Sequence, residues 1–99
     1  MKLFFAVHLT ENDACAEQAR NFYPFEDKKK AVSFIKDKVQ TCRVSLVSTQ
    51  TNVDWVVVSD WISDWYIVPL DVSENWNRVS LQRELFDKIF EAIVPAEVN

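Results

Sequence analysis

The sequence predicts an α+β fold: a two-layer sandwich in which two amphipathic helices cover one face of a mainly antiparallel sheet of about four strands. Three runs rich in β-branched and aromatic residues, 43–49, 53–59 and 65–72, follow one another with turns between them, which is typical of an antiparallel meander. Apolar stripes at helical spacing flank this meander. We therefore expect the order β-α-β-β-β-α within a single domain, residues 1–99.

The N-terminal part is predicted to supply the fourth strand. Residues 2–9 are dominated by Phe, Val and Leu, as in a strand covered by other elements. Residues 11–21 are a short helix or a loop, because Thr10 and Asp13 have the spacing of a capping box but the apolar face is thin. Residues 21–25 are expected to be an aromatic connector, since the proline among them disfavours helix.

Two longer helices are predicted from their apolar periodicity. The first spans about residues 26–40, and the second spans about residues 80–93 and ends before Pro95. The third strand of the meander, residues 65–72, contains Pro69, which cannot donate a ladder hydrogen bond. We therefore expect this strand to lie at the edge of the sheet or to carry a bulge.

The chain contains no glycine, and this excludes several kinds of site. Phosphate loops, dinucleotide fingerprints and nucleophile elbows all need glycine where the backbone turns sharply or approaches a ligand. Type I′ turns and left-handed helix caps must then use Asn or Asp, or be replaced by longer loops. The available asparagines are Asn12, Asn21, Asn52, Asn75 and Asn77.

The residues that bind metals are scarce. One histidine, Cys15 and Cys42 have no metal-ligand spacing, so no metal and no cofactor are predicted. The apolar N-terminus is short for a signal peptide, and no run approaches the roughly 20 apolar residues that span a bilayer. We therefore expect a cytoplasmic protein with reduced thiols and no membrane partner.

The favoured function is a non-enzymatic protein-interaction or regulatory module. The stretch 44–77 has acidic residues, no Lys or Arg, and all 4 tryptophans of a chain whose net charge is -4. Indole rings supply apolar anchor area, and carboxylates match a basic partner. Alternation places Trp55 and Trp65 mainly in the core. The predicted binding residues lie in or beside turns: Trp61, Trp76, Asp60, Asp64 and Glu74. The expected partner is another protein or a second copy of the chain, which would make a homodimer.

Two alternatives stay open. The first is contact with nucleic acid or another anion through the helix start at Lys28, Lys29 and Lys30, although the net charge of -4 makes nucleic acid an unfavourable partner. A variant of the favoured reading is an inhibitor whose carboxylates mimic nucleic acid. The second alternative is a small-ligand or catalytic pocket at His8, with either cysteine as nucleophile.

The order of elements resembles that of small prophage-type proteins. The likeness lies in the segment FYPFEDKKKAVSFIKDKV, residues 22–39, placed before a meander that ends in DWYIVPLDV, residues 64–72. It concerns shape and size. It implies a bacterial or phage accessory context and transfers no residue role.

Overall fold

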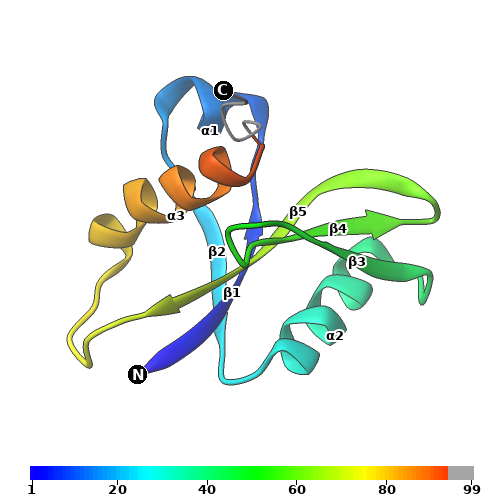
Figure 1. The fold of residues 1–99 in the computed structure, drawn as a ribbon, viewed down its shortest axis with the longest axis horizontal. Helices are drawn as coiled ribbons and strands as arrows, with labels where there is room; N and C mark the ends of the chain where they lie inside the picture. Colours follow the sequence, from blue (N-terminus) through cyan, green and yellow to red (C-terminus); the bar gives the residue numbers. More distant parts are fainter. Residues whose placement is uncertain (94–99) are drawn as a thin grey trace.

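The computed structural model describes residues 1–93 as one five-stranded antiparallel sheet with three helices (Figure 1). The elements in chain order are β1 (Lys2–His8), α1 (Glu11–Ala16), β2 (Asn21–Phe25), α2 (Lys28–Val39), β3 (Val44–Ser48), β4 (Asp54–Val58), β5 (Trp61–Asp71) and α3 (Arg78–Ile93). The strand order across the sheet is β2-β1-β5-β4-β3. The predicted α+β class and antiparallel sheet are confirmed, but the prediction of four strands is wrong. The last predicted helix begins two residues earlier than expected, at Arg78, and ends at Ile93 as predicted. Pro95, which was expected to stop it, lies outside the described residues.

The strand that the sequence does not predict is β2, which was expected to be a connector. It pairs with β1, with Phe22 opposite Val7. Because β2 is an edge strand, the missing N–H of Pro24 can be accommodated there. Phe22 is fully buried, so at least this aromatic residue of the expected connector is part of the core.

The proline in the last strand does not mark an edge, because β5 is the central strand of the sheet. Pro69 pairs with Phe4 of β1, whereas the pairing with β4 ends two residues earlier, at Ile67. Beyond the end of β4 no ladder donor is needed on that side. A register shift does interrupt the pairing with β4, and there the hydroxyl of Ser63 donates to the carbonyl of Val56 at 2.7 Å.

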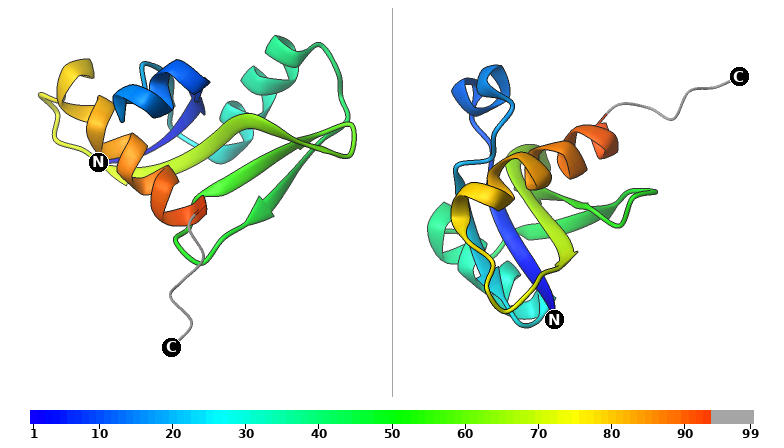
Figure 2. Two further views of the ribbon diagram at one scale, coloured as in Figure 1. Left: turned by 90° about the horizontal axis from the view of Figure 1, so that it is seen from above. Right: turned by 90° about the vertical axis from the view of Figure 1, so that its left-hand side faces the viewer.

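The two long helices lie on opposite faces of the sheet, and the prediction that both cover one face is therefore wrong (Figure 2). The core on the α2 side contains Ala6 and Ile35, and the core on the α3 side contains Phe5 and Leu85. Neighbouring residues of β1 thus belong to different cores. The unbroken apolar run of β1 requires cover on both faces of the central strands.

Five residues within 1–93 have a positive φ, and the expectation that Asn or Asp would fill such positions holds only for Asn52 and Asp60. Glu17 and Gln40 have φ of 54° and 57° at the ends of α1 and α2, and Asn52 has φ of 67° in the turn before β4. Of the five candidate asparagines, only Asn52 is used in this way. The predicted capping box of α1 is confirmed, but the helix ends at Ala16 rather than near residue 21.

Candidate functional site

The β4–β5 hairpin brings together three of the five predicted binding residues. Trp61 directly follows the hairpin turn and is 78% exposed, and Asp60 and Asp64 are exposed beside it. The other two, Glu74 and Trp76, lie after the far end of β5. The eleven residues of β5 extend about 33 Å at about 3.3 Å per residue, so the five residues do not form one surface.

The second predicted anchor, Trp76, is half-buried against the α3-side core. Its ring meets the ring of Phe5 edge-on, with 5.8 Å between the ring centroids. Trp65 is buried in the α2-side core, as expected, and Trp55 is half-buried. Trp61 is therefore the one tryptophan that presents most of its ring to solvent.

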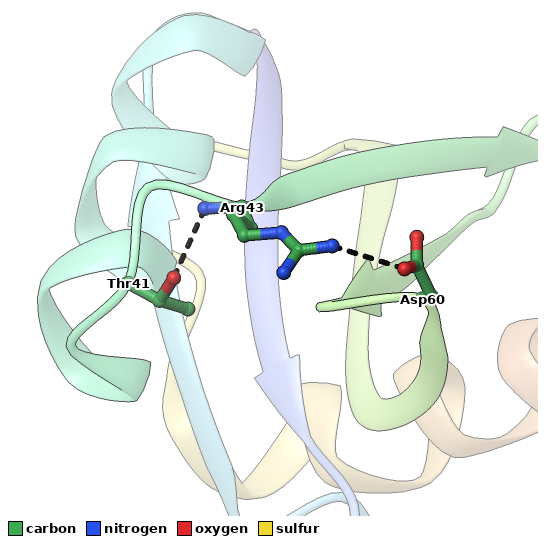
Figure 3. Close-up of polar contacts among 3 residues, drawn as sticks. All are labelled: Thr41, Arg43 and Asp60. Carbon is green, nitrogen blue, oxygen red and sulfur yellow. Dashed lines mark hydrogen bonds and ion pairs between the residues drawn. The ribbon is translucent and has the colours of Figure 1, made fainter.

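The turn of the hairpin consists of Ser59 and Asp60, whose φ angles are 49° and 71°. Two residues with positive φ between paired strands form a type I′ turn, which usually contains Asn-Gly. The guanidinium of Arg43 lies 3.0 Å from the carboxylate of Asp60, and the N–H of Arg43 donates to the hydroxyl of Thr41 at 3.1 Å (Figure 3). Both charged side chains are exposed, so this pair contributes little stability while it joins the hairpin tip to the start of β3.

An apolar surface lies beside the hairpin, on the α3 side of β3, β4 and the first half of β5. Cross-strand pairing aligns Val47, Trp55 and Tyr66 in one row, and Val57 and Ile62 in the next. Tyr66 packs against the α3-side core, which identifies the face. We call these five residues the open sheet face.

No helix in residues 1–93 covers most of the open sheet face. From β3, β4 and their connecting turn, only Val53 belongs to the α3-side core, whereas α2 packs over the other face of the same strands. Ile62 is 64% exposed and Val47 is 46% exposed. Trp61 pairs with Val58, which packs on the α2-side core, so its ring lies on the other side of the hairpin from Ile62. The open sheet face is thus an exposed apolar patch of the kind that marks interaction sites, and Trp61 adds exposed apolar area on the opposite side of the same hairpin.

Two residues of the open sheet face, Trp55 and Tyr66, carry polar groups. The indole N–H of Trp55 is buried and makes no hydrogen bond within residues 1–93, although a buried indole usually finds an acceptor. Burial raises the pKa of the Tyr66 phenol above 10.0, and the negative charge of Asp64 raises it further. A carboxylate thus lies close to the exposed apolar rows.

The sequence analysis did not identify Val47 or Ile62 as candidate binding residues. Ile62 was assigned to a turn between strands, although the sequence also allows a shorter turn that would place it in a strand. A two-residue turn at Ser59 and Asp60 places Ile62 directly opposite Val57 and continues the β4–β5 ladder.

The basic run at the start of α2 does not act as one cluster. The ammonium of Lys28 lies 2.7 Å from the buried carboxylate of Asp54, and that of Lys30 lies 3.7 Å from Glu26. Lys28 and Lys29 both line a groove between α2 and β3, and Lys29 makes no ion pair within residues 1–93. The nucleic-acid alternative stays a prediction, with one of the three lysines free of an ion pair within residues 1–93.

The His8 alternative also stays a prediction. His8 stacks on Trp65, with 4.7 Å between the ring centroids, and this contact gives the imidazole a packing role. Cys15 lies on α1 and Cys42 between α2 and β3, and both are exposed free thiols. In the part of the chain that the structure describes, no three His, Cys, Asp or Glu residues are grouped as metal ligands would be.

Comparison with protein-family models, with curated proteins and with solved structures finds no match to this chain. None of the helices within residues 1–93 has the length and hydropathy needed to cross a bilayer. The site therefore has to be interpreted from its own geometry: an exposed apolar sheet face, a tryptophan at the tip of its hairpin and carboxylates beside it.

Proposed function

We propose that this chain is a protein-binding module that uses the open sheet face and the β4–β5 hairpin. One observation carries the proposal: Val56 and Leu46 pack on the α2-side core, while on the other side of β3, β4 and the first half of β5 Val47 and Ile62 are exposed and Trp55 and Val57 are only half-buried. Contiguous apolar patches are rarely left exposed on a protein surface unless they bind a partner. Aromatic side chains on a rigid sheet are favoured at the centres of interfaces.

The chemistry of the surface favours a particular kind of partner. Trp61 and Ile62 supply large exposed apolar area at the hairpin tip. Asp64 adds a negative charge next to Tyr66. We infer a partner surface with an apolar centre and basic residues at its rim.

A different protein fits this surface better than a second copy does. In a two-fold symmetric pairing the same patch meets itself. Pairing the open sheet face with itself would bring the Asp64 carboxylates of the two copies towards one interface, and like charges at an interface oppose association.

Affinity capture with matched variants tests the proposal. The bait is the full chain as wild type, as Trp61→Ala with Ile62→Ser, and as Val79→Ser. Val79 is 77% exposed on α3, away from the hairpin, so it controls for the loss of exposed apolar area. We expect a protein that wild type and Val79→Ser retain equally and that the double variant loses at least tenfold. Equal retention by all three baits would contradict the proposal.

A further inference from the structure

The two edges of the sheet differ in how they are protected. The β2 edge carries Pro24, which cannot donate to an added strand. The β3 edge has the sequence Val-Ser-Leu-Val-Ser, without a charge or a proline, and lies beside α2 (Figure 1). An uncharged edge strand with open backbone groups is a template for pairing with another chain.

The hydrogen bonds at the ends of the β3–β4 ladder identify the open groups. The N–H of Ser59 donates to the carbonyl of Arg43 at 2.8 Å, and the N–H of Thr49 donates to the carbonyl of Val53 at 3.2 Å. Because hydrogen-bonded pairs alternate along an antiparallel ladder, the odd-numbered residues of β3 direct their backbone towards β4. Leu46 and Ser48 therefore direct their N–H and C=O groups outward.

A groove of about 380 Å³ runs between this edge and α2. Val32 and Leu46 provide its apolar lining, and Lys29 and Lys36 add two ammonium groups. Lys28 also lines the groove, but its ammonium is paired with Asp54. Neither Lys29 nor Lys36 makes an ion pair in the described part of the chain. The groove is thus basic, although the whole chain has a net charge of -4.

We propose that the β3 edge binds an acidic peptide as an added strand, with its side chains in the groove between β3 and α2. Three independent features agree: outward ladder groups at Leu46 and Ser48, an apolar lining for one side chain, and two uncompensated cations for acidic side chains. Main-chain bonds supply affinity in this mode of recognition, and the pockets for alternate side chains supply specificity. This site is separate from the open sheet face and does not depend on the function proposed above.

The geometry defines the peptide pattern. Alternate side chains of an added strand project to the α2 side, about 6.6 Å apart. Lys29 and Lys36 are seven residues apart on α2, which corresponds to about 10.5 Å along the helix axis. Acidic side chains four residues apart, with an apolar one midway, span about 13 Å and can reach both ammonium groups.

Synthetic peptides and fluorescence anisotropy provide the test. The probe is a labelled heptapeptide, Thr-Glu-Thr-Val-Thr-Glu-Thr, and the control peptide has Lys in place of both Glu. We expect saturable binding of the acidic peptide at least tenfold tighter than that of the basic one. Equal binding of the two, or no binding at millimolar peptide, would overturn the proposal.

Charge variants of the full chain locate the site. We expect Lys29→Glu with Lys36→Glu to weaken binding of the acidic peptide at least tenfold. The matched control, Lys30→Glu with Lys38→Glu, makes the same change of net charge on the same helix outside the groove, and we expect a change of less than threefold. An equal loss in both double variants would indicate attraction by net charge alone and would overturn the assignment.

A backbone variant tests whether the peptide adds as a strand. Ser48→Pro removes an outward N–H and leaves the β4 ladder intact, whereas Ser48→Ala keeps that N–H. We expect Ser48→Pro to weaken peptide binding at least fivefold and Ser48→Ala to change it less than twofold. In the wild-type complex we expect the NMR signals of the Leu46 and Ser48 amide protons to shift downfield. Equal binding by the two variants, or tighter binding of a ten-residue oligothymidylate than of the peptide, would overturn strand addition.

Discussion

The ammonium of Lys28 lies 2.7 Å from the carboxylate of Asp54, which joins the first residue of α2 to the first residue of β4. The Asp54 side chain is only 4% exposed, and a buried carboxylate needs a cation or several hydrogen bonds. The pair explains why a lysine stands in the first turn of α2, where the helix dipole disfavours positive charge. The basic run thus has a structural role for at least one of its members.

Loss of this cation should destabilise the fold. We expect Lys28→Met to lower the free energy of unfolding by about 1–2 kcal/mol, less than for a fully buried pair because Lys28 is partly exposed. Lys30→Met breaks only an exposed pair and should change it by less than about 0.5 kcal/mol. Urea denaturation measures both values. Equal effects of the two variants would show that burial of Asp54 does not govern the pair.

Trp61 and Trp76, which the sequence placed at turns, should differ in how much they contribute to the stability of the fold. Trp76 packs edge-on against Phe5, so we expect Trp76→Ala to cost about 2 kcal/mol or more. Trp61 is 78% exposed, and Trp61→Ala should stay within about 0.5 kcal/mol. Thermal and urea unfolding provide the comparison. A large loss of stability in Trp61→Ala would remove Trp61 from the proposed binding surface.

Substitutions in the β4–β5 turn should increase the stability of the fold. Ser59 and Asp60 both hold positive φ, a conformation that disfavours residues with a Cβ. We expect Ser59→Asn with Asp60→Gly to raise the free energy of unfolding by about 1 kcal/mol, because Asn-Gly suits a type I′ turn and the lost ion pair with Arg43 is exposed. A destabilised double variant in urea would show that the ion pair outweighs the backbone conformation.

The raised pKa of the Tyr66 phenol predicts how the stability of the fold changes at alkaline pH. Burial and the charge of Asp64 raise its pKa in the folded state. The unfolded chain therefore releases this proton first, so the stability contributed by neutral Tyr66 is present below about pH 10 and is lost as the pH rises through the folded-state pKa. We expect Tyr66→Phe to flatten the fall of stability above pH 10, measured by urea midpoints from pH 8 to pH 11. An unchanged slope in the variant would contradict the burial of this hydroxyl.

Local patterns in the sequence predicted most elements. The capping box at Thr10, the amphipathic stripe of α3 and the β-branched runs of the meander each depend on neighbours in sequence, and each is present in the structure. The last strand of the meander, β5, begins at Trp61, four residues before the predicted start, because the turn before it is shorter than expected. The prediction for residues 21–25 failed because pairing with β1 outweighs the local preference set by Pro24 at a sheet edge. Such pairing is a long-range property that propensity alone does not reveal.

The candidate site was predictable only in part. Asp60 and Trp61 were found because a turn exposes its residues. The exposure of Val47 and Ile62 depends on which part of the sheet α3 covers, and hydrophobic periodicity does not report that position. The same limit explains why α2 and α3 were placed on one face: periodicity shows that a helix has an apolar face, and it does not show which side of the sheet that face meets.

Site-specific photo-crosslinking tests the central claim, that the open sheet face binds another protein, most directly. A photoreactive amino acid replaces Ile62 in one form of the full chain and Val79 in another, and both forms are irradiated in cells that express the chain. We predict one discrete crosslinked protein, other than a second copy of the chain, from position 62 and none from position 79. Crosslinks of equal yield from both positions, or none from position 62, would contradict the account.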